Sequence, residues 1–424
     1  MMVKTTADMN ALLKDMGTAA ESAAKALRKS STDAKNEALL AMAEALEENK
    51  SFILEENKKD MMHSKEAGYQ DAMVERLALN EARIEGMKDG LKQMAALPDP
   101  IAKTQDQWVN KDGLRISKRS VPLGVIGIIY ESRPNVTVDA TGLCLKAGNS
   151  VILRGGKEAV NSNKALVKVL QEGLSKSSIP ADSIQLITDP SRELAAAFMK
   201  FNEGLDCLIP RGGANLIQSV LKNATVPVIE TGTGNCHLYV HEQADFEMAE
   251  SILVNGKTQR PSVCNALETL LIDRSIAKEA LPALTDALVQ KGVIIHGDET
   301  VCSITDEAVA AEEEDYEKEY LGNEIAVKVV EDYEDAIGHI EKHSSGHSDA
   351  IITGSYEHAQ NFLNDVDSAA VYVNASTRFT DGAEFGFGGE IGISTQKLHA
   401  RGPMGLEALT SYKYVVEGMG QTKG

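Results

Sequence analysis

The chain has few cysteines, few aromatic residues and no long apolar run, and these shortages exclude several classes of protein. Five cysteines in 424 residues are odd in number and widely scattered. Such usage excludes a disulfide framework or a zinc ribbon and is typical of the reducing cytoplasm. No run of eighteen apolar residues is present, so no membrane span is expected. The N-terminal segment lacks a continuous apolar stretch, and we therefore expect no signal peptide.

Positive charge is also scarce. The 43 Lys and Arg residues stand against 63 Asp and Glu residues, which gives a net charge of −20. Such a field repels nucleic acids and anionic membranes, so neither is expected as a partner. A locally basic turn is then more informative, because an anionic ligand would need one.

The periodicity of apolar residues changes along the chain. Near the N-terminus, Leu39, Met42, Ala43 and Leu46 recur at the spacing of one buried helical face. A short hairpin is predicted around Asp112-Gly113. Beyond it, two successive sets of Val- and Ile-rich runs alternate with helical stretches, which predicts an α/β fold with two parallel sheets covered on both faces. The acidic segment 310–322 is predicted to be a solvated surface.

Two glycine-containing turns lead from a predicted strand into a predicted helix. The residues concerned are Arg154, Gly155, Gly156 and Lys157 in the first turn and Arg211, Gly212 and Gly213 in the second. Glycines let backbone amides approach a phosphate, and the basic side chains add positive charge. Taken alone, the first turn favours a plain strand-to-helix connection over a phosphate site, because it lacks the dinucleotide-binding fingerprint. Together they would converge at the carboxyl edge of one sheet, where ligands of α/β folds bind.

One cysteine differs from the others in its setting. Cys264 stands where the polar loop "KTQRPSVC" meets an apolar strand, so it could be a nucleophile or a small core residue. The other four cysteines are interpreted as buried hydrophobic residues. Glu230, at the end of an apolar run, could be a base beside a cleft or a turn partner.

Three histidines, His339, His343 and His347, are spaced like the ligands of a metal on one helix. The "SSG" sequence after His343 breaks that helix, and no carboxylate–histidine motif accompanies it. We therefore expect no metal site and a helix-cap or interface role for these side chains.

These motifs, in their order along the chain, resemble the aldehyde dehydrogenase superfamily and, within it, the gamma-glutamyl phosphate reductase family. "PLGVIGIIYESRP" resembles the first strand of the cofactor domain, and "AGNSVILRGGKEA" resembles the turn at the adenosine ribose. Glu230 in "IETGTGN" matches the superfamily's cleft glutamate, and Cys264 follows 34 residues later, as the catalytic thiol should. Glu324 in "GNEIAVK" matches the glutamate that holds the nicotinamide ribose. "IIYESRPNVT" and "VVEDYEDAIGHIEKHSSGHSDAII" are the parts specific to the reductases.

The resemblance implies an aldehyde-dehydrogenase-like α/β fold with two Rossmann-like domains and a β oligomerisation arm. The implied boundaries are 1–104 and 122–232 for the cofactor-binding domain, 233–388 for the catalytic domain, 105–121 and 408–420 for the arm, and 389–407 for a return segment. The implied assembly is a dimer or tetramer in the cytoplasm, with channelling to glutamate 5-kinase as a further expectation.

The implied reaction is the NADPH-dependent reduction of gamma-glutamyl phosphate to glutamate-5-semialdehyde and phosphate, the second step of proline biosynthesis from glutamate. Cys264 would form a thioester, Asn135 and Glu230 would assist catalysis, and Arg154 and Lys157 would bind the 2′-phosphate of NADPH. Candidates for substrate binding are Ser132, Arg133, Arg378 and Arg401. Ser132 and Arg133 also remain alternatives to Asn135 as the oxyanion donor, because the superfamily's usual segment is replaced here by "YESRPN".

Two alternatives stay open from the sequence. A hydrolytic NAD(P)-dependent semialdehyde dehydrogenase would need Glu230 as a base and would not depend on phosphate. A scaffold without catalytic activity would keep the fold but would leave Cys264 with the reactivity of an ordinary thiol.

Overall fold

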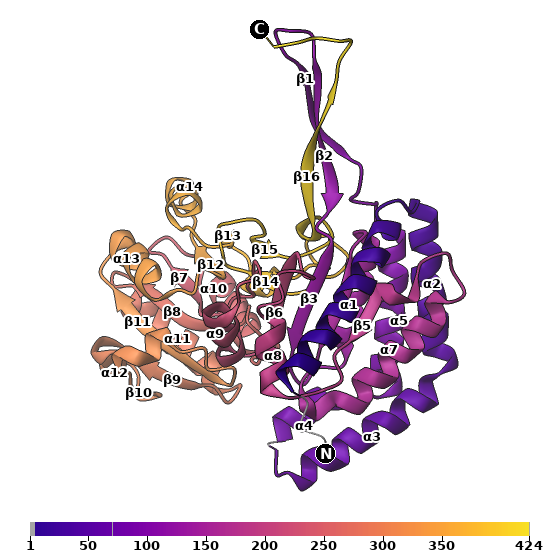
Figure 1. Cartoon of the computed structure of the whole chain (residues 1–424). Coiled ribbons are helices and arrows are strands. Elements are labelled where there is room, and N and C mark those ends of the chain that lie inside the picture. Colours follow the sequence, from indigo (N-terminus) through magenta and orange to yellow (C-terminus); the bar gives the residue numbers. More distant parts are fainter. Residues whose placement is uncertain (1–4, 70, 424) are drawn as a thin grey trace. The chain divides into compact units, whose positions relative to one another are not determined.

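The computed structural model of the chain describes residues 5–69 and 71–423 (Figure 1). By its internal contacts the chain divides into two compact units. Unit 1 comprises Met1–Thr231, Gly386–Gly392 and Met404–Gly424 so far as these are described, and unit 2 comprises Gly232–Phe385 and Ile393–Pro403. The stretch expected as a return segment is therefore shared between both units. No helix in the described part is long and apolar enough to cross a membrane.

Unit 1 begins with helices α1 (Thr6–Leu27), α2 (Thr32–Glu48), α3 (Lys50–Glu66), α4 (Asp71–Leu77) and α5 (Glu81–Ala96). The hydroxyl of Ser31 accepts a backbone N–H at the start of α2, which satisfies one donor that the helix leaves unpaired. Leu39, Met42, Ala43 and Leu46 are all buried on one face of α2, which packs against α5 and α7. The helix predicted from their spacing is confirmed.

The sheet of unit 1 is wholly parallel, with strand order β5-β4-β3-β6. Its strands are β3 (Val125–Tyr130), β4 (Ser150–Arg154), β5 (Ile184–Leu186) and β6 (Cys207–Arg211). The connecting elements are α6 (Asn135–Lys146), η1 (Lys157–Ala159), α7 (Val160–Leu174), η2 (Ala181–Ser183), α8 (Arg192–Phe198) and α9 (Ala214–Asn223). Because parallel strands end at one edge, the turns after β3, β4 and β6 lie together there.

The sheet of unit 2 has strand order β10-β9-β11-β8-β7-β12-β13, and every neighbouring pair in it is parallel. Its strands are β7 (Cys236–Val240), β8 (Leu267–Asp273), β9 (Ile294–Gly297), β10 (Ala308–Ala310), β11 (Glu324–Val330), β12 (Ser348–Ile352) and β13 (Ala370–Val373). The other elements are α10 (Phe246–Thr258), α11 (Ala277–Val289), α12 (Glu299–Ile304), η3 (Glu313–Glu317), α13 (Tyr333–His343), α14 (Tyr356–Asp365), η4 (Thr377–Phe379), β14 (Ile393–Ser394) and β15 (Gly402–Pro403). Two parallel α/β sheets confirm the predicted fold class.

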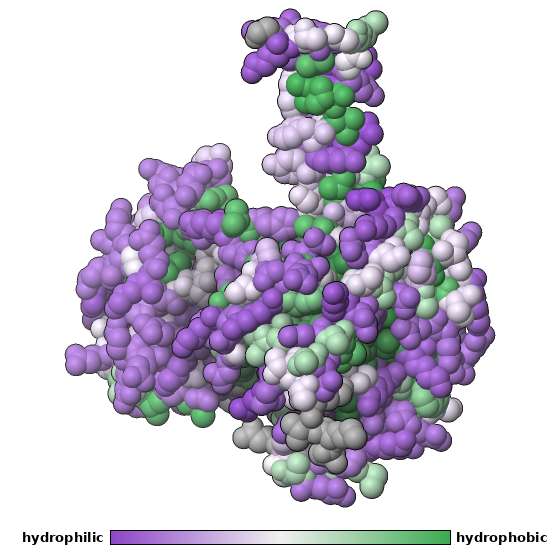
Figure 2. All heavy atoms as spheres, in the orientation of Figure 1, coloured by the Kyte–Doolittle hydropathy of each residue, from purple (hydrophilic) through white to green (hydrophobic). Residues whose placement is uncertain are grey.

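An antiparallel ribbon projects from unit 1 (Figure 1). It consists of β1 (Thr104–Val109), β2 (Arg115–Pro122) and β16 (Thr410–Glu417), which follows η5 (Glu407–Leu409). Gly113 has φ 81° at the β1–β2 turn, a left-handed conformation that favours glycine, so the hairpin predicted around Asp112-Gly113 is confirmed. Figure 2 shows hydrophobic residues on the ribbon. Its exposed residues include the apolar Val109 and Val416 and the aromatic Trp108 and Tyr414.

Candidate active site

Cys264 in unit 2 lies in the loop between the end of α10 and the start of β8. The loop contains Pro261, which cannot donate to a helix ladder and helps to end the helix before the thiol. Cys264 is partly exposed, whereas Cys144, Cys207 and Cys236 are buried. Burial raises the pKa of all three of those thiols, to about 12 for Cys207, so they stay protonated.

Cys302 does not fit the expectation that the four remaining cysteines are buried. It is only partly buried on α12, and its Sγ donates to the carbonyl oxygen of Gly297 at 3.4 Å. Exposure alone therefore does not distinguish Cys264 from Cys302. The distinction depends on the residues that surround Cys264.

The backbone of Cys264 rests on the segment before β7. A Cβ added to Gly234 would lie 1.6 Å from the carbonyl oxygen of Cys264, so only glycine fits at that position. The thiol of Cys236 donates to the same oxygen at 3.2 Å. The backbone N–H of Gly234 in turn donates to Glu319 Oε1 at 2.9 Å. The glycines of "TGTGNC" thus allow a close backbone contact that fixes the position of the nucleophile candidate.

Glu319 belongs to the acidic segment 310–322, and the prediction of a solvated surface there is wrong in part. Asp315 and Tyr316 are buried, and the carbonyl of Tyr316 accepts from Asn235 Nδ2 at 2.6 Å. The segment supports the loop beneath Cys264 because its few buried residues anchor it. Its glutamates, which dominate the sequence pattern, remain exposed apart from Glu319, which is partly buried.

Within unit 2, the proposed substrate arginine Arg378 lies near Cys264, whose charge acts on it. It lies on η4, and its Nε donates to Gln259 Oε1 at 2.9 Å. Burial and then the charge of Arg260 lower its pKa, while Cys264 acts in the opposite direction. Arg260 therefore lies near Arg378, and Arg378 lies near the thiol. Sequence reasoning missed Arg260, although the Arg-Pro pair in the cysteine loop could have indicated it.

Arg401 has a different role within unit 2. Its Nη2 donates to the carboxylate and to the backbone carbonyl of Asp367, at 2.8 and 2.6 Å. This surface ion pair, which Lys397 also joins, uses the guanidinium that substrate binding would require. Arg133, in unit 1, is partly buried in the turn after β3.

The turn after β3 in unit 1 holds the candidates for the oxyanion donor. Ser132 has φ 36°, an unusual conformation for a residue with a side chain. Its backbone N–H and hydroxyl both donate to Glu158 Oε1, at 2.7 and 2.9 Å. Asn135 donates one N–H to Asp139 Oδ2 at 2.9 Å, which leaves its second amide hydrogen for another acceptor. The geometry of this turn favours Asn135 over Ser132 as a donor.

Asp139 carries a perturbed carboxyl group below this turn. Burial raises its pKa to about 6, while the Asn135 hydrogen bond and the charge of Arg211 act in the opposite direction. The side chain that orients Asn135 therefore titrates near neutrality. It was not visible from the sequence, because nothing in "NVTVDATG" distinguishes a partly buried aspartate from a solvated one.

The first glycine turn has no room for side chains at its two glycines. An added Cβ would lie 2.1 Å from Asn163 Nδ2 at Gly155 and 2.0 Å from Glu158 Oε1 at Gly156. Lys157 is exposed, whereas Arg154 donates to the backbone carbonyls of Pro190 and Ser191, at 3.0 and 3.3 Å. Lys157 rather than Arg154 is therefore the cation that this turn presents to a ligand.

The second glycine turn already contacts an anion of the chain itself. Glu131 Oε2 accepts the backbone N–H of Gly213, the N-cap of α9, at 3.0 Å. A Cβ on Gly212 would lie 2.6 Å from the same oxygen. The carboxylate thus occupies part of the helix terminus at which a phosphate was expected to bind.

The two remaining glutamates of the predicted site lie in different units. Glu230 is partly buried near the end of the first segment of unit 1. Glu324 begins β11 in unit 2, where its Oε2 contacts His296 Nε2 at 3.0 Å. Its side chain is 42% exposed, so a ligand hydroxyl could still reach it.

A buried ion pair brackets the cysteine loop. Lys257, near the end of α10, and Glu268, at the start of β8, are both 0% exposed, with Nζ and Oε2 2.5 Å apart. Burial raises the pKa of Glu268 to about 7 and lowers that of Lys257. The pair joins the two ends of the loop that carries Cys264, and the sequence motifs gave no sign of it.

The three histidines lie within the protein interior. His339 and His343 are buried on α13, which ends at His343, and their ring centroids are 4.5 Å apart. Burial lowers the pKa of His339 to about 2, so that ring stays neutral. Across residues 5–69 and 71–423, no group of three or more His, Cys, Asp or Glu residues is placed to hold a metal ion.

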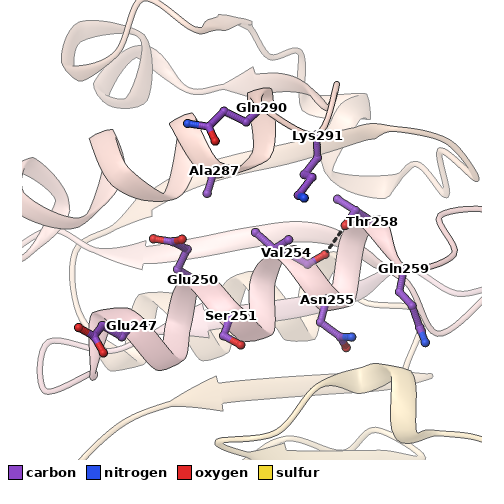
Figure 3. Close-up of a pocket in the computed structure, with 10 residues that line it drawn as sticks. All are labelled: Glu247, Glu250, Ser251, Val254, Asn255, Thr258, Gln259, Ala287, Gln290 and Lys291. Atoms are coloured by element: carbon purple, nitrogen blue, oxygen red, sulfur yellow. Dashed lines mark hydrogen bonds between the residues drawn. The ribbon is translucent and has the colours of Figure 1, made fainter.

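A separate polar groove of about 610 Å³ runs between α10 and α11 (Figure 3). Glu247, Glu250 and Asn255 line it along α10, and Gln290 and Lys291 line it at the end of α11. Neither Cys264 nor Arg378 lines this groove. Gln259 lines this groove and also contacts Arg378.

Comparison with known proteins gives a consistent result over nearly the whole chain. The family model "Aldehyde dehydrogenase family" matches residues 2–301 and 307–415. A gamma-glutamyl phosphate reductase of Clostridium botulinum is 58% identical over 407 residues, which cover 96% of this chain and 98% of that protein. The one from Carboxydothermus hydrogenoformans is 56% identical over 405 residues, with the same coverage.

Solved structures agree with the sequence comparison. The crystal structure of gamma-glutamyl phosphate reductase from Thermotoga maritima has a TM-score of 0.95 and 48% identity, covering 97% of this chain and 100% of that one. An acetylating aldehyde dehydrogenase from Geobacillus thermoglucosidasius shares the fold, with a TM-score of 0.70 and 17% identity over 100% of both chains.

Proposed function

The chain belongs to the aldehyde dehydrogenase family and, within it, to the gamma-glutamyl phosphate reductases, and we propose that it reduces gamma-glutamyl phosphate to glutamate-5-semialdehyde and inorganic phosphate, with NADPH as the reductant, in the biosynthesis of proline. The observation that carries this proposal is the partly exposed Cys264 beside two arginines, in a chain that matches these reductases over 96% of its length.

The proposed reaction forms and breaks one covalent bond to the enzyme. The thiolate of Cys264 attacks the acyl carbon, the bond from that carbon to the phosphate oxygen breaks, and phosphate leaves with the electron pair. The thioester that remains divides one difficult step into two easier ones. A bound nicotinamide supplies the hydride equivalent. The resulting tetrahedral oxyanion expels the Cys264 thiolate, and the aldehyde is released.

The oxyanion requires hydrogen-bond donors. We assign this role to the backbone N–H of Cys264 and to the Asn135 amide, because Asp139 takes only one of the two amide hydrogens of Asn135. Each such donor is typically worth about 3 kcal/mol in the transition state.

Glu230 is assigned a supporting role in this proposal. Phosphate, and not water, exchanges with the thioester, so no carboxylate is needed to activate water; Glu230 would tune the thiol or position the nicotinamide. We expect Cys264→Ala to reduce turnover more than about 10⁴-fold, since it removes the nucleophile. Glu230→Gln should cost far less, and equal losses in both variants would contradict this assignment.

The residues of the two turns fit a nicotinamide dinucleotide. Gly155 and Gly156 leave backbone where side chains would collide, and the exposed Lys157 can meet a 2′-phosphate. We propose NADPH over NADH on that basis, with Gly212 and Gly213 near the pyrophosphate, Arg211 alongside, and Glu324 at the nicotinamide ribose. Arg154 would shape this site by holding the loop at Pro190.

We further propose that the ribbon β1-β2-β16 is the oligomerisation arm of a dimer or a tetramer. Exchange of such strands between two copies gives an isologous interface and covers the exposed Trp108 and Tyr414. Association with glutamate 5-kinase stays a proposal that rests on the reaction sequence alone.

One experiment tests the function directly. NADP reduction is followed with glutamate-5-semialdehyde, with and without inorganic phosphate, for the wild type and for Cys264→Ala. The proposal expects reduction that requires both phosphate and the thiol. Phosphate-independent reduction that is lost in Glu230→Gln would instead identify a hydrolytic semialdehyde dehydrogenase.

A further inference from the structure

We propose that Arg260 and Arg378 together form the subsite for the phosphoryl group of the substrate, a clamp of two guanidinium groups beside the sulfur of Cys264. The inference rests on the proposed function and adds a binding site to it. Arg260 is included because it follows Gln259, the hydrogen-bond partner of Arg378, in the sequence.

The clamp is attached to the backbone that carries the nucleophile. Asn265, the residue after Cys264, donates through Nδ2 to the carbonyl of Thr380 at 2.9 Å, and its own carbonyl accepts from Thr377 Oγ1 at 2.7 Å. These hydrogen bonds fix η4, and with it Arg378, against the cysteine loop. Gln259, next to Arg260 in sequence, holds the Nε of Arg378. Arg378 is therefore tied to both ends of the loop that carries the thiol.

The charge at this place is unbalanced in a strongly acidic protein. Within the described part of the chain, neither Arg260 nor Arg378 forms an ion pair with a carboxylate. Asp381 is the carboxylate whose charge acts on Arg378, and its Oδ1 accepts the backbone N–H of Ala383 at 2.8 Å. Arg274 and Arg401 in the same unit each pair with one, Glu331 and Asp367 respectively. With a net charge of −20, carboxylates are plentiful, so two adjacent guanidinium groups without one are unusual. Their mutual repulsion would be relieved by a bound anion.

The chemistry of the substrate decides which anion binds. The phosphoryl group is joined to the acyl carbon through a single oxygen, whereas the α-carboxylate lies at the far end of the side chain. A group next to the attacking sulfur therefore meets the phosphate first. Two planar guanidinium groups also match a phosphate dianion in geometry, and their charge stabilises it as it leaves with the electron pair of the broken carbon–oxygen bond.

The test measures the affinity for phosphate in the oxidative direction, where inorganic phosphate is a substrate. For Arg260→Gln and Arg378→Gln, we expect the KM for phosphate to rise about tenfold each, which corresponds to about 1.4 kcal/mol. The KM for NADP should change little, and Arg260→Lys should restore part of the loss because it keeps the charge but not the fork. Arg274→Gln, which removes an exposed arginine paired with Glu331, is the matched control.

A second measurement does not depend on turnover. Mass spectrometry follows the alkylation of the Cys264 peptide by the anion iodoacetate and by neutral iodoacetamide. We expect the wild type to favour iodoacetate, added phosphate to reduce that preference, and Arg260→Gln to lower it at least about threefold.

The outcomes separate the two hypotheses. If the wild type reduces NADP without phosphate, the proposed function is wrong. A second outcome would contradict the clamp alone. In it, wild-type turnover needs phosphate, but Arg260→Gln and Arg378→Gln have the same KM for phosphate and the same alkylation ratio as the control Arg274→Gln. The proposed function would then stand without the clamp.

Discussion

In unit 2, the loop that carries Cys264 and the adjoining η4 present two guanidinium groups that form no ion pair within the described residues, whereas in unit 1 the chain's own carboxylates contact the turns at which phosphates are expected. Arg260 and Arg378 form no ion pair within the described residues. In unit 1, Glu131 accepts from Gly213, and Glu158 accepts from Ser132 beside the first glycine turn. The two units thus differ in whether an incoming anion must displace an internal one.

This difference predicts different energetics for the two ligands. An anion at the cysteine loop gains attraction without breaking an ion pair, while an anion at the α9 terminus must first move Glu131. The cysteine loop is also held by buried groups, since the Lys257–Glu268 pair joins its two ends. The turns of unit 1 are held by partly exposed groups, which rearrange at lower cost. We therefore expect the substrate side to be preorganised and the cofactor side to adjust on binding.

The largest expected effect concerns the rigidity of the cysteine loop. Lys257→Met leaves Glu268 buried without its partner, and breaking such a pair typically costs about 3–5 kcal/mol of unfolding free energy. The loss should be smaller at acid pH, because Glu268 has a raised pKa of about 7 and then becomes neutral. Urea unfolding at several pH values measures both effects.

The matched control for this pair removes both charges. In Lys257→Met/Glu268→Leu, no unpaired charge remains buried, so most of the lost stability should return. If the double variant is as unstable as the single one, the pair is not what stabilises the loop. The cysteine loop would then not be preorganised by this ion pair, and the expected contrast with the turns of unit 1 would be lost.

Much of this arrangement followed from local sequence patterns, and the rest depends on contacts that no local pattern contains. Alternating apolar runs predicted both parallel sheets, whereas the position of Cys264 between a polar loop and a strand left a nucleophile and a small core residue as alternatives. Arg378 reaches that thiol only because η4 folds back onto the loop from 113 residues away, as its carbonyl's contact with Asn265 shows. Glu131 contacts Gly213 across 82 residues. Contacts between residues so far apart in the sequence are determined by the topology of the chain and not by local sequence patterns.

A second effect concerns Asp139, the carboxyl group beneath Asn135 in unit 1. Its pKa is raised from 3.8 to about 6, so the folded state binds its proton more tightly than the unfolded state. This contribution to stability is fully present below about pH 4 and is lost as the pH rises through 6. Asp139→Asn does not titrate, so its stability relative to the wild type should rise between pH 4 and pH 7 by up to about 3 kcal/mol.

Urea unfolding across that pH range measures the difference. Asp182→Asn, at an exposed aspartate of unit 1, serves as the control for the loss of a surface carboxylate. If the stability difference between Asp139→Asn and the wild type does not change with pH, the carboxyl group of Asp139 is not desolvated. Asn135 would then not be oriented by a desolvated carboxyl group.

A smaller effect is expected at Lys157, the exposed cation of the first glycine turn. Lys157→Glu replaces an attractive charge at the proposed 2′-phosphate by a repulsive one. We expect the preference for NADPH over NADH, measured as the ratio of kcat/KM values, to fall at least about tenfold. Lys164→Glu changes the same charge at an exposed position of α7 and should leave the ratio unchanged. Equal ratios in both variants would place the 2′-phosphate elsewhere.

The smallest expected effect lies at Glu131 and would sharpen the contrast between the units. Glu131→Gln keeps the size of the side chain but removes the charge that competes with a phosphate at the N-terminus of α9, where Gly213 donates to it. A helix terminus and one anion interact by about 0.3–1 kcal/mol, so the Kd for NADPH should fall about two- to fivefold. Binding is measured by the fluorescence of NADPH at low salt, and the gain in affinity should shrink as salt is added.

Glu193→Gln, on the exposed first turn of α8, removes the same charge without contact with Gly213 and should leave the Kd unchanged. Weaker binding by Glu131→Gln would instead make this carboxylate a support that the turn needs, so that both units would present their ligand sites already formed.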